Sequence, residues 1–209
     1  MKNLRIENGN YLFDLHRNGE IHKNFSFNLP GKHNLFNAAT ALAMAMAYGI
    51  PEELVKAALA EFRGVSRRFT YKIKTEELVL IDDYAHHPEE IRAAHEAVRA
   101  MHPGKEVLAV FQPHLFSRTR DFAEEFAQSL DLFDQVRLLD IYPAREEAIE
   151  GITSKWLLGK LKSRNKKLLD KEGLADDIKA AGAPVIIMLG AGDIGEEVEK
   201  VKSALEDEN

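Results

Sequence analysis

The chain has 209 residues, of which 45% are hydrophobic and 30% charged, so it is long enough to bury one sizeable core or two smaller ones. A formal net charge of −6, with no dense run of Lys and Arg, argues against binding to nucleic acid or to an anionic membrane. The chain contains no cysteine, which excludes a disulfide scaffold and a thiolate metal site, and it shows neither a signal-peptide core nor a bilayer-spanning apolar run. Together these features predict a soluble protein of the cytoplasm.

Residues 1–30 have the pattern of β-strands joined by tight turns. Asn8-Gly9-Asn10 and Asn18-Gly19 are hairpin-turn signals between short apolar runs. Phe25–Leu29 alternates apolar and polar residues, which is typical of a strand with one buried face. Pro30 and Gly31 then end this strand-rich part of the chain.

Two helices are predicted next. Ala38–Ala47 is apolar on every side, which predicts a helix that is buried all round. Asn34 and Asn37 lie one turn apart at its entrance; either side chain could cap the helix, or the two could bind a ligand together. After Gly49, residues Pro51–Phe62 keep helical spacing and predict a second helix.

The segment Gly64–Phe69 breaks the helical pattern and is the predicted boundary between domains at 1–66 and 67–209. Beyond it, apolar strands alternate with amphipathic helices, which predicts an α/β domain with a mostly parallel, Rossmann-like sheet and helices on both faces. Residues 1–66 look like an incomplete α/β piece, because their fully apolar helix lacks enough partners. The strands of the second domain are expected at 69–74, 78–84, 107–111, 136–141, 167–169 and 185–189, and its helices at 88–101, 118–130, 154–163, 173–181 and 195–206.

Parallel sheets bind ligands at the carboxyl ends of their strands, and several predicted strands end in polar side chains. Arginine and histidine close to a helix N-terminus favour a carboxylate or phosphate ligand. Each arginine alone could equally be an exposed cation, but several such endings on one edge favour a binding site. The residues are Asp82, Asp83, Tyr84, His86 and His87; Gln112, His114, Ser117, Arg118 and Arg120; Asp140, Tyr142, Arg145 and Glu146; and Gly190–Gly195.

Gly190-Ala191-Gly192-Asp193-Ile194-Gly195 matches the G-x-G-x-x-G pattern of dinucleotide sites. It lies in the last strand–helix unit and has no acidic residue about twenty positions further on, which argues against a Rossmann-type oxidoreductase. We interpret the motif as a tight turn that brings backbone N–H groups to the edge of the sheet. His86, His87 and His114 do not have metal-ligand spacing, so no metal site is predicted there.

Several segments of the chain, taken together, resemble one known family. They are Gly31–Ala38, Gly64–Phe69, Asp82–Pro88, Phe111–His114 with Ser117–Arg120, and Gly190–Ile194. They occur in the order found in the Mur ligases, the ATP-dependent amide ligases of peptidoglycan precursor synthesis, and they extend over nearly the whole chain after residue 30. Within the family they are most similar to the members that join L-alanine to UDP-N-acetylmuramate.

This resemblance implies a reaction in which ATP, with Mg²⁺, phosphorylates the muramoyl carboxylate, after which the amine of L-alanine attacks the acyl phosphate. It also implies roles for single residues. Those on the nucleotide side are Asn34, Asn37, Arg68 and Asp83, with Asp83 accepting hydrogen bonds from the ribose. Those near the incoming amino acid are Tyr84, His86, His114 and Arg118, of which His86 and Arg118 are the expected catalytic residues and Arg118 pairs with the substrate carboxylate.

Two departures from the family pattern limit this implication. The sequence contains no G-x-x-x-x-G-K-[ST] phosphate loop, so we expect residues 1–66 to be the C-terminal portion of the central ATP-binding domain, with the main magnesium ligands elsewhere, and the chain alone to be inactive. Leu115 stands where some members have a second arginine beside the amino acid. Two alternatives stay open: a non-catalytic module that binds nucleotide or amino acid, and the related ligase that attaches a recycled tripeptide.

Overall fold

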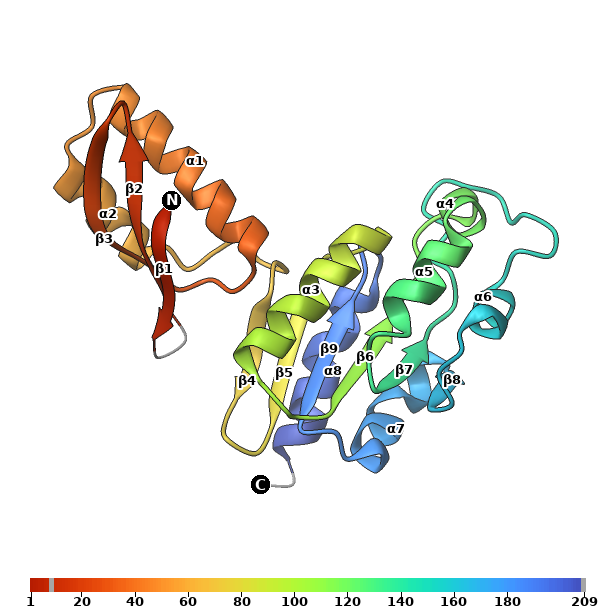
Figure 1. The fold of residues 1–209 in the computed structure, drawn as a ribbon. Coiled ribbons are helices and arrows are strands. Elements are labelled where there is room, and N and C mark those ends of the chain that lie inside the picture. Colours follow the sequence, from red (N-terminus) through yellow and green to blue (C-terminus); the bar gives the residue numbers. More distant parts are fainter. Residues whose placement is uncertain (8–9, 208–209) are drawn as a thin grey trace. The chain divides into compact units, whose positions relative to one another are not determined.

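The computed structural model describes residues 1–7 and 10–207, and the chain divides into two compact units (Figure 1). The first consists of Met1–Val65 with Glu96–Met101, and the second of Ser66–His95 with His102–Asn209. Within the described part of the chain, no helix is both long enough and apolar enough to cross a membrane.

The first unit is a small antiparallel sheet packed against two helices. Its strands β1 (Lys2–Glu7), β2 (Asn10–Arg17) and β3 (Glu20–Phe27) lie in that order and pack against α1 (Lys32–Ala47) and α2 (Glu52–Glu61). The predicted turn at Asn18-Gly19 is confirmed, since both residues have the positive φ that such a hairpin turn requires (50° and 83°). The turn predicted at Asn8-Gly9-Asn10 includes residues 8 and 9, which lie outside the described residues.

The prediction that the first helix is buried on every side is wrong. Leu35, Ala38 and Leu42 face the core, whereas Met44 is 68% exposed on the other side of α1. Because this helix is apolar all round, its sequence does not indicate which side is buried. The sheet and α2 pack against one side and thereby decide it.

The start of α1 also differs from the prediction. The helix begins at Lys32, so Asn34 and Asn37 lie within its first two turns rather than before it. The N-cap residue is Gly31, and neither asparagine caps the helix. The Nδ2 of Asn34 instead donates to the carbonyl oxygen of Pro30 at 2.7 Å, and Asn37 is exposed.

The second unit is built on the mostly parallel sheet that the sequence predicts. Only β4 runs antiparallel to its neighbour, and the last strand of the chain, β9, lies between β5 and β6. Every residue of β5, β6 and β9 is buried, as expected for strands covered on both faces. The order is β4 (Thr70–Lys74), β5 (Val79–Asp83), β9 (Val185–Leu189), β6 (Val107–Phe111), β7 (Gln135–Leu138) and β8 (Lys166–Leu168).

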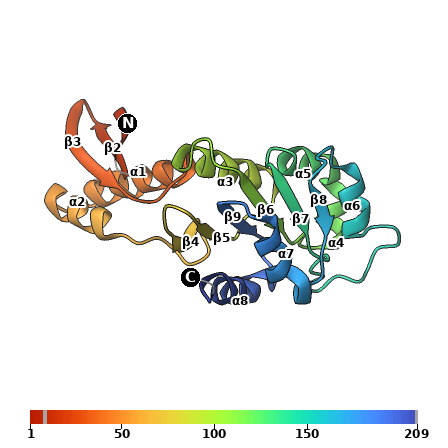
Figure 2. The same cartoon turned by 90° about the horizontal axis from the view of Figure 1, so that it is seen from below.

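Helices cover both faces of this sheet, as Figure 2 shows: α3 and α5 lie on one face, and α7 and α8 on the other. The single helix predicted at 118–130 is in fact two, α4 and α5, because the backbone bends at Phe122 (φ −116°, ψ 24°). The bounds are α3 (Pro88–Met101), α4 (Phe116–Asp121), α5 (Ala123–Leu130), α6 (Ser154–Lys160), the short 3₁₀ helix η1 (Lys171–Gly173), α7 (Leu174–Ala181) and α8 (Ile194–Glu206).

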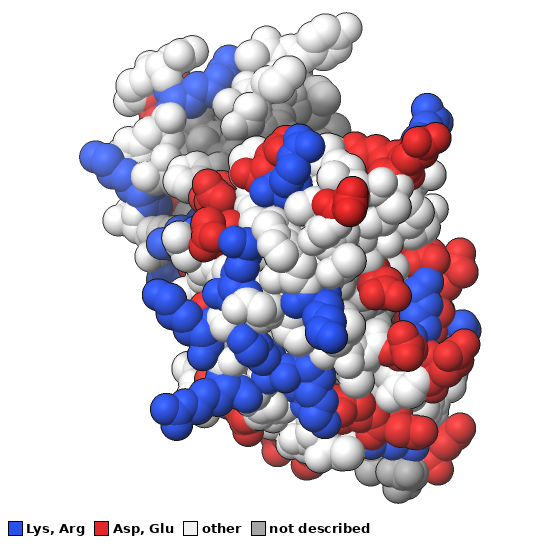
Figure 3. All heavy atoms as spheres, turned by 90° about the vertical axis from the view of Figure 1, so that its right-hand side faces the viewer, with Lys and Arg blue, Asp and Glu red and all other residues white. Residues whose placement is uncertain are grey.

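Despite the net charge of −6, residues 155–167 are rich in Lys and Arg, which the sequence analysis did not pick out. Figure 3 views the end of the sheet where α6 and β8 lie, and Lys and Arg gather on one side of this face. Two of the cations are paired with acids, Lys160 with Glu124 at 2.7 Å and Lys167 with Asp177 at 2.5 Å. Lysines on an edge strand such as β8 discourage pairing with a strand of another molecule. The basic residues of this segment are Lys155, Lys160, Lys162, Arg164, Lys166 and Lys167.

The one-sided burial of α1 predicts a contrast between two neighbouring positions. Leu42 is 4% exposed, so Leu42→Ala should lower the free energy of unfolding by about 2–5 kcal/mol. Met44→Ala should change it by no more than about 0.5 kcal/mol. Urea unfolding of the two variants measures both values. Equal losses would show that α1 buries Met44 as well as Leu42.

Candidate functional site

The carboxyl ends of β5, β9, β6 and β7 lie side by side at one edge of the sheet. The parallel register sets Leu189 level with both Asp83 and Phe111. Backbone hydrogen bonds continue past the strands, from Gly190 N to Asp83 O at 3.1 Å and from Gln112 N to Leu189 O at 3.0 Å. The polar strand endings picked out in the sequence therefore meet, and we call this edge the rim: residues 82–87, 112–118, 140–146 and 190–195.

Asp83 ends β5, and its buried carboxylate holds the backbone on either side of the strand. Oδ2 accepts from Phe69 N at 2.7 Å, and Oδ1 accepts from Ala85 N at 2.8 Å. Burial raises the pKa of Asp83 to about 6, although these two hydrogen bonds and the nearby Arg68 favour the charged form. Each oxygen keeps a lone pair for a further donor, which the ribose contact expected from the resemblance would use.

Asp82, the neighbour of Asp83 on β5, is buried as well. Burial raises the pKa of Asp82, and the charge of Arg67 opposes this shift. The Nε of Arg67 lies 3.4 Å from Oδ1 of Asp82. The two adjacent acids are thus buried together at the carboxyl end of β5.

Tyr84 and His86 follow β5 onto the rim. Their rings pack edge to face with centroids 5.2 Å apart. The Nδ1 of His86 lies 2.9 Å from the carbonyl oxygen of Tyr84 and 3.2 Å from Oε2 of Glu90. Because a carbonyl oxygen only accepts hydrogen bonds, the neutral imidazole carries its proton on Nδ1, and Nε2 is an acceptor.

His114 lies between His86 and Tyr142, with ring centroids 5.9 Å from the first and 5.6 Å from the second. Burial and the charge of Arg118 lower the pKa of His114, which favours the neutral form of this imidazole. Arg118 Nη1 lies 3.4 Å from His114 Nδ1 and donates to it. The structure therefore brings together all the residues predicted to lie near the amino acid: Tyr84, His86, His114 and Arg118.

The short helix α4, which carries Arg118, is anchored by residues of the fourth predicted strand ending. Leu115 N donates to Tyr142 O at 2.9 Å, and Ser117 N donates to Oε2 of Glu146 at 2.9 Å. The Ser117 hydroxyl also donates to this carboxylate, and these hydrogen bonds lower the pKa of Glu146. Leu115 itself has φ 73° and forms the turn into α4. Tyr142 and Glu146 thus position the Arg118 helix.

The glycine motif is a tight turn, as predicted, and one of its backbone N–H groups has a partner within the protein. Ile194 N donates to Oε1 of Gln112 at 2.9 Å, so this N–H is not offered to a ligand. Gln112 is 2% exposed, and its Nε2 donates to Asp193 at 2.7 Å. A Cβ at Gly192 would lie 2.5 Å from Gln112 Oε1 and 2.7 Å from Cβ of Tyr142. Glycine is needed there because these side chains approach closely.

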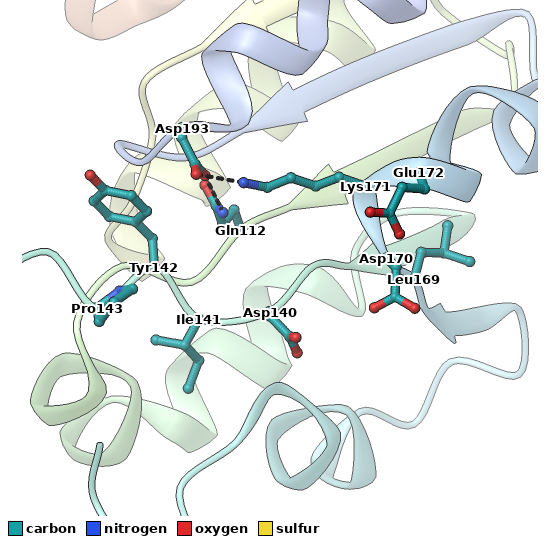
Figure 4. Close-up of a pocket in the computed structure, with 10 residues that line it drawn as sticks. All are labelled: Gln112, Asp140, Ile141, Tyr142, Pro143, Leu169, Asp170, Lys171, Glu172 and Asp193. Carbon is teal, nitrogen blue, oxygen red and sulfur yellow. Dashed lines mark hydrogen bonds and ion pairs between the residues drawn. The ribbon is translucent and has the colours of Figure 1, made fainter. Parts of the chain in front are cut away.

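A pocket of about 350 Å³ opens on the rim beside Tyr142 (Figure 4). Lys171 reaches across it and pairs with Asp193 at 2.5 Å. The sequence analysis missed the contribution of the segment after β8, although that strand ends at the same edge of the sheet. The pocket is lined by Gln112, Asp140, Ile141, Tyr142, Pro143, Leu169, Asp170, Lys171, Glu172 and Asp193.

The residues expected on the nucleotide side are divided between the two units. Asn34 and Asn37 belong to α1 of the first unit. In the second unit, Arg68 is exposed; its guanidinium lies 5.4 Å from the centre of the Tyr84 ring and 3.8 Å from Glu90. Among the described residues, no group of three or more His, Asp or Glu side chains could hold a metal ion.

Comparison with known proteins assigns the family. The family model described as "Mur ligase, glutamate ligase domain" matches residues 67–195. The chain belongs to the Mur ligase family. The resemblance found in the sequence is therefore confirmed, together with the α/β fold.

Individual Mur ligases are similar to nearly the whole chain. The proteins named UDP-N-acetylmuramate–L-alanine ligase in Christiangramia forsetii and Flavobacterium johnsoniae are 64% and 59% identical to it, over 98% and 97% of its length. The chain spans 45% of the length of each of these relatives. The crystal structure of UDP-N-acetylmuramate-alanine ligase MurC from Thermotoga maritima matches 100% of this chain and 46% of its own, with a TM-score of 0.84 and 25% identity.

In this Mur ligase chain, sequence reasoning also missed Arg67. Arg67 lies within Gly64–Phe69, one of the segments that carry the family resemblance, but the resemblance gave it no role. In the structure its guanidinium donates to the carbonyl oxygen of Gly190 at 2.6 Å. The adjacent Arg68 lies in the same local sequence but is exposed. No local signal separates the two arginines, because the partner of Arg67 lies 123 positions further along the chain.

Burial of Asp83 predicts a pH-dependent stability. The pKa of its carboxyl group rises from 3.8 to about 6 on folding. Between these pH values the carboxyl is mostly ionised in the unfolded chain and mostly protonated in the folded one. The stability that this group contributes is present below about pH 4 and is lost as pH rises through about 6. Relative to Asp83→Asn, the wild-type free energy of unfolding should therefore fall by about 2 kcal/mol between pH 4 and pH 7. Denaturant unfolding at several pH values measures this difference, and a constant difference would contradict the buried, proton-binding Asp83.

Proposed function

We propose that this chain is the part of an ATP-dependent ligase that holds L-alanine while its amine attacks the activated carboxyl group of UDP-N-acetylmuramate. The observation that carries the proposal is the cluster of Tyr84, His86, His114 and Arg118 on the rim, in a chain 64% identical to a protein named for this ligation. In this proposal residues 1–66 are the C-terminal portion of the central ATP-binding domain, residues 67–209 are the C-terminal domain, and the ligase works in the cytoplasm.

Arg118 suits the carboxylate of an amino acid. A guanidinium presents parallel N–H donors that match the two oxygens of a carboxylate, which a lysine does not. The neutral His114 accepts from Nη1 of Arg118 and so orients the guanidinium without competing for the anion. Tyr142, stacked on His114, and Glu146, which holds α4, keep this arrangement in place.

His86 suits the amine of the same substrate. An amino acid in water carries an ammonium group, which must lose a proton before its nitrogen can act as a nucleophile. With its proton on Nδ1, His86 offers Nε2 as the acceptor for that proton or for the N–H of the amine. The His86 and His114 rings lie 5.9 Å apart. One small amino acid could therefore place its carboxylate at Arg118, beside His114, and its amine at His86.

ATP, when bound, supplies the phosphoryl group that activates the muramoyl carboxylate. The exposed Arg68 over Tyr84 and the remaining lone pairs of Asp83 fit a polyanionic ligand with a hydroxylated sugar, and Asn34 and Asn37 are proposed for the adenine side. Mg²⁺ accompanies ATP in this proposal, with its main ligands outside this chain, since no group of three or more His, Asp or Glu among the described residues could hold it.

A chimera tests the function directly. Residues of this chain would replace the matching 204 residues of the Christiangramia forsetii relative, and phosphate release would be measured with UDP-N-acetylmuramate and ATP. Phosphate release that depends on L-alanine is expected from the chimera and not from the isolated chain. Activity with a tripeptide but not with L-alanine would instead assign the recycling ligase. An inactive chimera whose rim still binds nucleotide or L-alanine by calorimetry would favour a binding module.

Arg118 should control the affinity for L-alanine rather than for ATP. In the chimera, Arg118→Ala removes a charge-assisted pair, which corresponds to a rise of about 10–100-fold in the KM for L-alanine. Arg120→Ala on the same helix is the matched control, because Arg120, although predicted with Arg118, lies outside the rim, is exposed and pairs with the adjacent Asp121 at 2.8 Å. Steady-state kinetics measures both constants. If the KM for ATP rose while that for L-alanine did not, the placement of Arg118 would be refuted.

A further inference from the structure

Arg67 joins two parts of the second unit that are distant in sequence. Its Nη2 donates to Gly190 O at 2.6 Å and its Nη1 lies 3.4 Å from Gly192 O, so it binds the turn between β9 and α8. Its Nε lies 3.4 Å from Asp82 at the end of β5. The side chain therefore ties the end of β5 to the glycine turn.

The guanidinium occupies a space that exists only because residue 195 is glycine. A Cβ at Gly195 would lie 2.6 Å from Cζ of Arg67 and 2.8 Å from its Nη1. Gly195 lies in the first turn of α8, and its backbone is not in the left-handed region, so alanine would suit the helix itself. The close approach of Arg67 is therefore what a side chain at this position would disturb.

A chain of contacts leads from Arg67 to His86. Tyr84 N donates to Arg67 O at 2.7 Å, and the guanidinium lies 5.2 Å from the centre of the Tyr84 ring. The carbonyl oxygen of Tyr84 in turn accepts from Nδ1 of His86 at 2.9 Å. Arg67 has φ 59°, a conformation that a residue with a side chain rarely adopts, so these contacts hold it in a strained backbone.

We propose that Arg67 is a positioning residue: seated against Gly195, it fixes Tyr84 and thereby holds the imidazole of His86 with its proton on Nδ1 and Nε2 as the acceptor. Arg67 does this without touching substrate. The kinetic consequence rests on the function proposed above, whereas the tautomer of His86 is a property of this chain by itself.

The tautomer is tested in the chain as it stands. Long-range ¹H–¹⁵N NMR at pH 8 reports which nitrogen of His86 is protonated. Arg67→Met removes the guanidinium, and Gly195→Ala displaces it while leaving it present, so both should reduce the share of the Nδ1–H form. Arg67→Lys, which can reach a single carbonyl oxygen, should lie between them and the wild type. Gly159→Ala is the matched control, since a Cβ there would meet nothing within 4 Å, and its spectrum should equal that of the wild type.

Backbone amide spectra establish that each variant is folded. If Arg67→Met does not fold, Gly195→Ala decides the question alone. A folded Gly195→Ala variant whose His86 keeps the wild-type tautomer would overturn the proposal.

Kinetics in the chimera separates positioning from general loss of structure. Arg67→Met and Gly195→Ala should each lower kcat by about tenfold or more while the KM for L-alanine changes less than about twofold. Because both changes break one contact, the double variant should be no slower than the slower single variant. Additive losses, or a rise in KM alone, would reject the positioning role. If the wild-type chimera is inactive, the proposed function fails, and the NMR result still decides the role of Arg67.

Discussion

The insertion of β9 between β5 and β6 is the constraint on which the rest of the rim depends. Leu189 stands level with Asp83 on one side and Phe111 on the other, and Gly190 continues the backbone pairing to Asp83. This arrangement places the glycine turn within reach of Arg67, Gln112 and Tyr142. The rim is therefore assembled by pairing between residues about a hundred positions apart, so it forms only when the last strand of the chain has been added.

The buried polar side chains at the ends of these strands form hydrogen bonds with neighbouring parts of the rim. Asp83 accepts from two backbone N–H groups, and Gln112 uses both ends of its amide on the segment after β9. A buried polar group without a partner costs about 1–3 kcal/mol, so each of these pairings also selects one loop conformation. Asp82, Asp83 and Gln112 form a buried inner layer, and the less buried Tyr84, His86, His114 and Arg118 lie outside it.

The sequence predicted the parts of this structure that depend on local pattern. The apolar runs at 79–81, 107–111 and 185–189 lie in strands because continuous apolar stretches suit a sheet covered on both faces. The grouping of His86, His114 and Arg118 was predictable because the carboxyl ends of parallel strands share an edge. The order of the strands in the sheet was not predictable, since the hydrophobic periodicity of a strand does not indicate which strands pair with it. The burial of α1 was predicted wrongly for a related reason: a helix that is apolar all round does not specify which side meets the sheet.

The glycine motif shows why a pattern can be recognised and its physical role still be missed. In a dinucleotide site, glycines let a pyrophosphate approach the backbone. Here the approaching groups are protein: Gln112 lies against Gly190 and Gly192, Tyr142 against Gly192, and Arg67 against Gly195. Both arrangements require positions without a Cβ, so both favour glycine at the same spacing. What distinguishes them is the set of groups that approach the glycines, and here side chains from distant parts of the chain do so.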